Sequence, residues 1–137
     1  MRSRLRKLEN SRGVAAAAVL LLGLAFCFGM YWWQLRYEYA LRDPVANLYL
    51  VIPFAGLAVL VVAGMTRAAA AASWLVLAGL TGVAYVWAAR SSSSTAAVAF
   101  VAPFLWGGLL VSTIFVVDYT IRRRRRKRGH EVPTTGT

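Results

Sequence analysis

The residues of this chain that could act as acids, bases, nucleophiles or metal ligands are few. The single histidine, His130, follows a basic block and has no neighbouring His or Cys that would complete a metal site. The single cysteine, Cys27, lies inside an apolar segment, where a thiol behaves as a small apolar side chain. The sequence therefore predicts no metal, no cofactor and no disulfide within the chain.

The carboxylates near the apolar segments have simple expected partners. Asp118 precedes Arg122 by four residues, and Glu38 precedes Arg42 by four, which is the spacing of ion pairs on a helix surface. Neither pair provides a general acid and a general base held together in a dry pocket. Ser112 lacks a base that would make it a nucleophile. We therefore predict no catalytic residue and a protein that is not an enzyme.

The charges are separated from the apolar segments. The chain has 137 residues, 59% of them hydrophobic, and a net charge of +11. Its mean hydropathy is +0.57. Uncharged stretches of 23, 23, 22 and 27 residues follow Arg12, Asp43, Arg67 and Arg90, respectively. Each is long enough to cross about 30 Å of hydrocarbon at about 1.5 Å per residue.

These stretches predict an all-α protein with a four-transmembrane-helix bundle. The helices are expected at about 13–35, 44–66, 68–89 and 95–121, within a single membrane domain of residues 13–121. Pro44 is expected to open the second helix, and Ser94 or Thr95 to cap the fourth. A basic N-terminal segment, residues 1–12, precedes the domain, and a basic tail, residues 122–137, is expected to be disordered.

The N-terminal segment has the basic character of a signal peptide, but the apolar run after it continues for about 21 residues without a small-x-small exit. Phe26 also places a bulky side chain where a lipoprotein cleavage site before Cys27 would need a small one. We expect an uncleaved anchor.

The distribution of basic residues predicts the orientation. If the N-terminus is cytoplasmic, 13 basic residues flank the spans on the inner side and three, Arg36, Arg42 and Arg90, on the outer side. Both termini are then expected in the cytoplasm. The predominance of Arg over Lys, 14 to 2, and the 23 Ala residues favour a bacterial source, and hence a bacterial cytoplasmic membrane.

Two motifs recur along the chain. Tyr-x-Trp-x-x-Arg occurs twice, 54 residues apart, and Pro-Phe occurs twice, 50 residues apart. The repeats suggest two similar helical hairpins, although Tyr and Trp gather at membrane interfaces in any case. Pro53 and Pro103 are expected to kink the second and fourth helices. The expected interfacial anchors are Tyr31, Trp32, Trp33, Arg36, Tyr85, Trp87 and Arg90.

Small residues spaced by four are expected to let helices approach one another closely. Such pairs are Ala25 with Gly29, Ala78 with Gly82, and Gly108 with Ser112. The third helix, which is rich in Ala and Gly, is the expected centre of the bundle. A strip that faces outward would be a docking surface for a partner.

The basic block after the fourth helix has several possible roles. We expect it to set topology and to bind anionic lipid; an acidic protein partner is an alternative. Nucleic acid is unlikely because no aromatic residue is interleaved and the block adjoins a membrane helix. Its residues are Arg122, Arg123, Arg124, Arg125, Arg126, Lys127 and Arg128.

The leading functional hypothesis is a non-enzymatic accessory or structural subunit of a larger membrane complex, because packing strips are present while ionisable groups are absent from the middle of the spans. The partner would be another integral membrane protein or a second copy of the chain. The alternative is a small oligomeric permease or channel for an uncharged or weakly polar solute. A membrane-disrupting or immunity-type protein is a third possibility.

Overall fold

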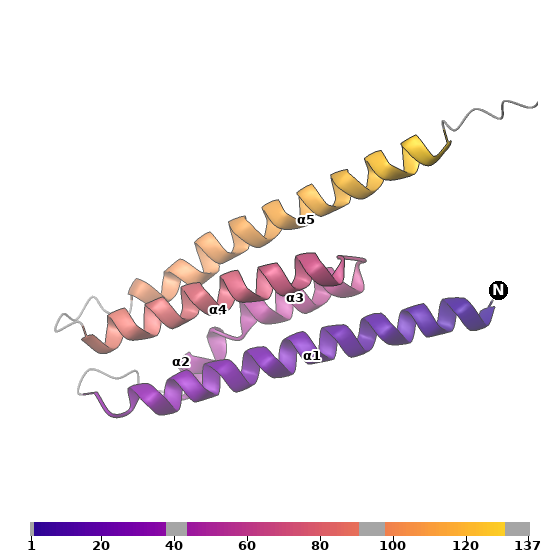
Figure 1. The fold of residues 1–137 in the computed structure, drawn as a ribbon. Coiled ribbons are helices and arrows are strands. Elements are labelled where there is room, and N and C mark those ends of the chain that lie inside the picture. Colours follow the sequence, from indigo (N-terminus) through magenta and orange to yellow (C-terminus); the bar gives the residue numbers. More distant parts are fainter. Residues whose placement is uncertain (1, 38–43, 91–97, 131–137) are drawn as a thin grey trace, which may run out of the picture.

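The computed structural model describes residues 2–37, 44–90 and 98–130, and this part of the chain consists of helices joined by short turns, without strands (Figure 1). Its helices are α1 (Arg2–Gln34), α2 (Pro44–Tyr49), α3 (Ile52–Val62), α4 (Arg67–Arg90) and α5 (Val101–His130). Three segments are long and apolar enough to cross a membrane, namely Arg6–Gln34, Arg67–Arg90 and Val98–Gly129; the apolar segment Asn47–Val62 is shorter.

The helices run roughly along one direction, with α3 and α4 between α1 and α5 (Figure 1). α1 packs chiefly on α3, and α4 chiefly on α5. The start of α1, the α3–α4 turn and the end of α5 lie at the same end of the bundle. Large side chains that are almost completely buried, among them Phe54, Leu57, Leu77 and Tyr85, fill the centre.

The second apolar segment is not one continuous helix over 44–66. It opens at Pro44 as predicted, but α2 ends at Tyr49 and α3 begins at Ile52. Pro53 has no N–H to donate to the carbonyl of Tyr49, so the helical ladder cannot pass through this point. The carbonyl of Leu50, in the break between α2 and α3, accepts a hydrogen bond from Cys27 Sγ, 3.8 Å away.

The predicted proline kinks are therefore wrong in kind. Pro53 lies in the first turn of α3, and Pro103 lies in the first turn of α5, directly after a 3₁₀ turn over residues 98–100. A proline in a first turn is tolerated because its missing N–H would have had no helical partner. Both prolines begin helices rather than bend them. The predicted caps Ser94 and Thr95 lie outside the described residues.

The α3–α4 turn, residues 63–66, ends α3 with a Schellman motif. Met65 N donates to Leu60 O at 3.0 Å, and Gly64 N donates to Val61 O at 3.1 Å. Gly64 has a φ of 112°, a left-handed conformation that favours glycine. Thr66 then caps α4, because its Oγ1 accepts a hydrogen bond from Ala69 N at 3.3 Å.

Two helices extend beyond the apolar segments predicted for them. α1 begins at Arg2, and α5 continues to His130, so residues 122–130 are helical where disorder was predicted. Arg and Lys have high intrinsic helix propensity, and cations near a helix C-terminus interact favourably with the helix dipole. The prediction of disorder is wrong for 122–130, and residues 131–137 lie outside the described part of the chain.

Candidate functional site

Some of the predicted interfacial anchors lie on the surface and others are partly or completely buried. Trp32, Trp87, Arg36 and Arg90 are exposed, and Tyr31 and Trp33 are half-buried. Tyr85 is completely buried, and its ring packs edge-on against Phe100, 5.1 Å between centroids. Tyr85 is therefore not an interfacial anchor. It is two residues from Trp87, so the two side chains point to nearly opposite faces of α4, and only Trp87 reaches the surface.

Of the predicted packing strips, one lies inside the bundle and two lie on its surface. Ala78 is buried, and a Cβ added at Gly82 would lie 3.6 Å from the Phe26 ring, so this strip is used inside the bundle between α4 and α1. Ala25 and Gly29 are exposed, as are Gly108 and Ser112. The added Cβ at Gly29 or at Gly108 would meet no atom within 4 Å. These two strips face outward.

Among the described glycines, two that the spacing rule did not select have the closest neighbours on other helices. A Cβ added at Gly23 would lie 2.6 Å from Cγ of Phe54, and one added at Gly107 would lie 2.6 Å from Cδ2 of Leu77. Each glycine receives a large side chain from the helix packed against it, α3 on α1 and α4 on α5. Close approach of this kind is what small residues permit in membrane bundles.

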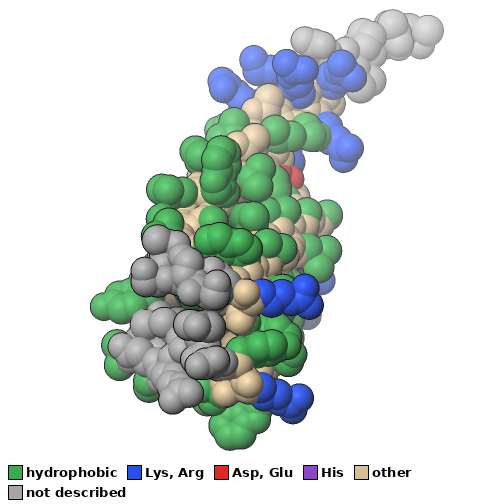
Figure 2. Space-filling view, turned by 90° about the vertical axis from the view of Figure 1, so that its left-hand side faces the viewer, with side chains coloured by type: hydrophobic (Ala, Val, Ile, Leu, Met, Phe, Trp, Pro, Cys, Tyr) green, Lys and Arg blue, Asp and Glu red, His purple; other side chains and the backbone are tan. Residues whose placement is uncertain are grey.

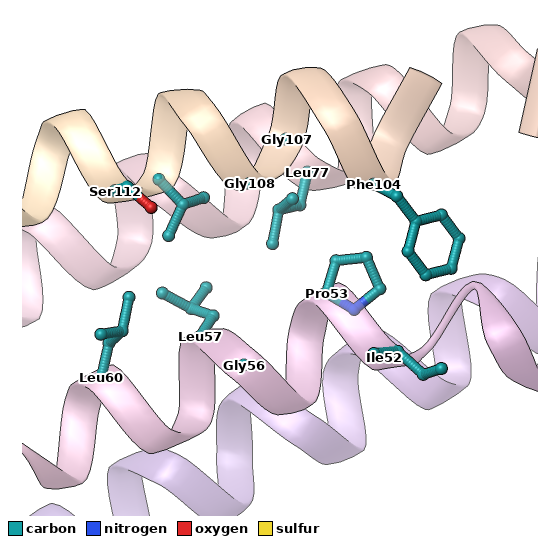
Figure 3. A pocket seen from close by; sticks show the side chains of 11 residues that line it. Ile52, Pro53, Gly56, Leu57, Leu60, Leu77, Phe104, Gly107, Gly108 and Ser112 are labelled. Carbon is teal, nitrogen blue, oxygen red and sulfur yellow. The ribbon is translucent and has the colours of Figure 1, made fainter. Parts of the chain in front are cut away.

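A groove of about 390 Å³ runs between α3 and α5, with Leu77 of α4 among its lining residues (Figure 3). One wall includes Pro53, Gly56 and Leu60 of α3. Of the lining residues only Ser112, on the opposite wall, has a polar side chain. The groove is therefore an apolar surface that offers a single hydroxyl group.

A glycine stands on each wall of this groove. Gly56 on α3 and Gly108 on α5 are both exposed, and a Cβ added at either would meet nothing within 4 Å. Their small size is therefore not needed for contacts among the described helices. The groove brings the outward-facing strip of Gly108 and Ser112 together with Pro53 and Gly56, a pair from a distant part of the sequence.

A polar cluster lies at the end of the bundle that holds the α3–α4 turn. Arg122 Nη2 lies 2.8 Å from Asp118 Oδ2, which confirms the predicted ion pair. Asp118 also accepts hydrogen bonds from Thr66 N, at 3.2 Å, and from Thr66 Oγ1, at 2.9 Å. Arg122 Nη1 donates to the carbonyl oxygen of Gly64. The pair thus joins α5 to the α3–α4 turn, a role that its spacing within one helix could not reveal.

The other residues of the basic block, 123–128, take no part in the interactions of this polar cluster. Residues 123–128 are exposed, and Figure 2 shows Lys and Arg side chains gathered beyond a mainly hydrophobic surface. Tyr119, Arg122, Arg123 and Arg126 line a shallow pocket of about 110 Å³. Arg122 is thereby distinguished from its neighbours, because it is already paired with Asp118.

Uncharged polar groups are buried along α4. Ser73, Thr81 and Tyr85 are completely buried and lie on one face at multiples of four residues. Within the described residues, the hydroxyls of all three have no hydrogen-bond partner. Their spacing by eight and four residues is visible in the sequence. Hydroxyls of Ser and Thr can turn toward carbonyls of their own helix, and they supply no charge for acid–base chemistry.

Metal ligands do not gather in the described part of the chain, where no group of three or more His, Cys, Asp or Glu side chains could hold an ion. Cys27 is buried and unpaired, and it donates only to the carbonyl of Leu50. The candidate site is therefore the apolar groove, with the basic end of α5 beside it. No protein-family model, curated protein or solved structure matches this chain.

Proposed function

We propose that this protein is a non-enzymatic accessory subunit of a larger membrane complex, and that it binds a transmembrane helix of its partner in the α3–α5 groove. The observation that carries the proposal is the pair of unused glycines, Gly56 and Gly108, on the two walls of an apolar groove. Helices associate in lipid through close packing rather than through the hydrophobic effect, so a strip of small residues is the surface that a partner helix needs.

The proposed arrangement in the membrane has four crossings. α1, α4 and α5 each cross once, and α2 and α3 together make the fourth crossing as a broken helix. Residues 44–62 rise about 28 Å at about 1.5 Å per residue, close to the thickness of the hydrocarbon core. The excess of basic residues at the shared end of α1 and α5 supports cytoplasmic termini in a bacterial cytoplasmic membrane.

The test uses four glycines at which an added Cβ would meet no atom within 4 Å. Gly56→Leu and Gly108→Leu fill the groove, while Gly29→Leu and Gly79→Leu add the same bulk on exposed faces of α1 and α4. We expect the groove variants to lose co-purification of the partner from native membranes, and the other two to retain it. Equal retention by all four would overturn the proposal.

Photo-crosslinking identifies what lies in the groove. A benzophenone amino acid at Ser112 should give one crosslinked product, whereas the same probe at Val83 or Leu22, both exposed, should give none. Loss of this product in Gly108→Leu would tie it to the groove. A product with twice the mass of the chain would show that the occupant is a second copy, and the accessory-subunit proposal would fail.

The buried hydroxyls of Ser73, Thr81 and Tyr85 support a second candidate function, the passage of an uncharged or weakly polar solute through an oligomer. Hydroxyls without partners are the groups that such a solute would bind. Flux of small solutes into liposomes should then fall in Ser73→Ala and Thr81→Val. Absence of flux with the wild-type protein would remove this candidate.

A further inference from the structure

We propose that the cytoplasmic end of α5 carries a discrete binding site for an anionic phospholipid. Tyr119, Arg123 and Arg126 would hold the phosphate of the headgroup. The exposed side chains of Leu109 and Val116 would contact an acyl chain. None of these residues lines the α3–α5 groove, so the site does not depend on what occupies the groove.

The headgroup residues lie on one face of a single helix. Tyr119, Arg123 and Arg126 stand at positions i, i+4 and i+7 of α5, within two helical turns, and they line the shallow pocket together with Arg122. Tyr119, Arg123 and Arg126 carry two guanidinium groups and a phenol hydroxyl, all of which can donate hydrogen bonds. Arginine is well suited to phosphate because its planar group can donate two parallel hydrogen bonds to phosphate oxygens.

These two arginines have no anion within the described protein. The described acidic residues are Glu9, near the start of α1, and Asp118. Asp118 is engaged by Arg122 and by Thr66, and it is only 14% exposed, so it does not neutralise the outer arginines. Like charges four residues apart on a helix repel each other. Arg123 with Lys127, and Arg122 with Arg126, have this spacing, and a bound phosphate would relieve the repulsion.

The apolar part of the site continues along the same side of the helix. Leu109, Val116 and Arg123 follow one another at intervals of seven residues, about two turns. Leu109 is 62% exposed and Val116 is 59% exposed. From Leu109 to Arg123 the helix rises about 21 Å, which is about the depth of one leaflet with its headgroup region. An acyl chain can therefore lie on the two apolar residues while its phosphate reaches the arginines.

This continuity distinguishes a phospholipid from free phosphate. Inorganic phosphate would contact only the pocket of Tyr119 and the arginines. A phospholipid would contact both the pocket and the apolar stripe. The stripe ends where the basic residues begin, as expected for a molecule that has an apolar chain and an anionic head.

The experiment compares two pairs of substitutions that remove the same charge. Arg123→Gln/Arg126→Gln removes the site, and Arg124→Gln/Arg128→Gln removes two exposed arginines from the other side of the helix. The purified full chain in neutral detergent is titrated with phosphatidylglycerol, and bound lipid is counted by native mass spectrometry. We expect affinity to fall about tenfold in the site pair and about twofold in the control pair, because only the former loses arginines that line the pocket.

Further measurements distinguish binding of a phospholipid from binding of inorganic phosphate. Tyr119→Phe should weaken phosphatidylglycerol binding without any change of charge. Val116→Ser should weaken binding of phosphatidylglycerol but not of inorganic phosphate. Phosphatidylcholine should bind less tightly than phosphatidylglycerol. Equal losses in the two arginine pairs would overturn the proposal in favour of general attraction to a basic helix. Displacement of the lipid by inorganic phosphate at similar concentration would also overturn it.

Discussion

Asp118 shows how the role of a residue changes when its neighbours in space are known. Its four-residue spacing from Arg122 predicts an ion pair on one helix, and the structure confirms that pair. The same carboxylate also accepts two hydrogen bonds from Thr66, on the turn between α3 and α4. It is only 14% exposed, whereas Arg122 is 33% exposed. The pair therefore stabilises the contact between α5 and that turn.

Thr66→Val tests this contact. The substitution removes the hydroxyl that donates to Asp118 and caps α4, so we expect the free energy of unfolding in detergent to fall by about 1–2 kcal/mol. Thr120→Val is the control, because the Thr120 hydroxyl is exposed and donates only to Val116 of its own helix. An equal loss of stability in both variants would contradict the proposed role of Thr66.

Gly23→Ala tests the close packing of α1 on α3. The new methyl group would lie within 2.8 Å of three Phe54 atoms, and Phe54 is completely buried, so we expect the free energy of unfolding to fall by about 1–3 kcal/mol. Gly29→Ala, on the same helix, meets nothing within 4 Å and should be neutral or slightly stabilising. Thermal unfolding of both variants in one detergent makes the comparison. An unchanged free energy of unfolding in Gly23→Ala would contradict close packing of α1 on α3 at this point.

At the scale of helices, the break between α2 and α3 is the main departure from the predicted pattern. An apolar run of 23 residues predicts one span, but it does not show where the hydrogen-bond ladder stops. Pro53 marks the region, where Leu50 is buried and its carbonyl accepts a hydrogen bond from Cys27 Sγ. Whether a proline bends a helix or begins one is decided by the packing of the residues before it.

A pair of proline substitutions tests this description. Pro53→Ala should change the free energy of unfolding by less than about 1 kcal/mol, because the first turn of α3 does not need that N–H. Ala58→Pro, in the middle of α3, should cost about 3 kcal/mol or more, since it removes an internal hydrogen bond and clashes with the preceding turn. Denaturant titration measures both. A large loss in Pro53→Ala would argue instead that the ring itself is essential.

The similarity of the two helical hairpins, which the recurring motifs suggest, remains a prediction. Gly23 and Leu77 are 54 residues apart, the spacing of the Tyr-x-Trp-x-x-Arg motif, yet they play opposite parts. Gly23 receives the ring of Phe54, whereas Leu77 packs over Gly107. Each hairpin therefore places a large side chain against a glycine, but from the opposite helix.

For the whole molecule, the shared end of α1, α5 and the α3–α4 turn determines which residues face the same side of a membrane. Arg12 is close to this turn, since a Cβ added at Gly64 would lie 3.8 Å from its guanidinium nitrogens. Arg12, Arg122 and the basic end of α5 thus form one charged end of the bundle. α1 and α4 end at the other end of the bundle (Figure 1), and Arg90 is the last residue of α4.

Cysteine labelling tests the orientation. In a Cys27→Ala background, a membrane-impermeant maleimide applied to intact cells should label Arg36→Cys, whereas Ser3→Cys and Gly129→Cys should react only after the membrane is opened. The expected pattern follows from the excess of basic residues beside Ser3 and Gly129. Labelling of all three positions in intact cells would indicate two orientations, and the reverse pattern would contradict cytoplasmic termini.

The sequence by itself determined the helical class, the approximate positions of the apolar segments and the Asp118–Arg122 pair. These depend on hydropathy and on spacing within one helix, which are local properties. Only the tertiary structure decided that Tyr85 is buried, that Gly23 and Gly107 each lie against a large side chain of the neighbouring helix, and that Gly56 and Gly108 face a common groove. Those facts depend on how each helix is rotated about its axis. In a uniformly apolar helix, hydropathy cannot fix that rotation, because lipid and protein interior attract the same side chains.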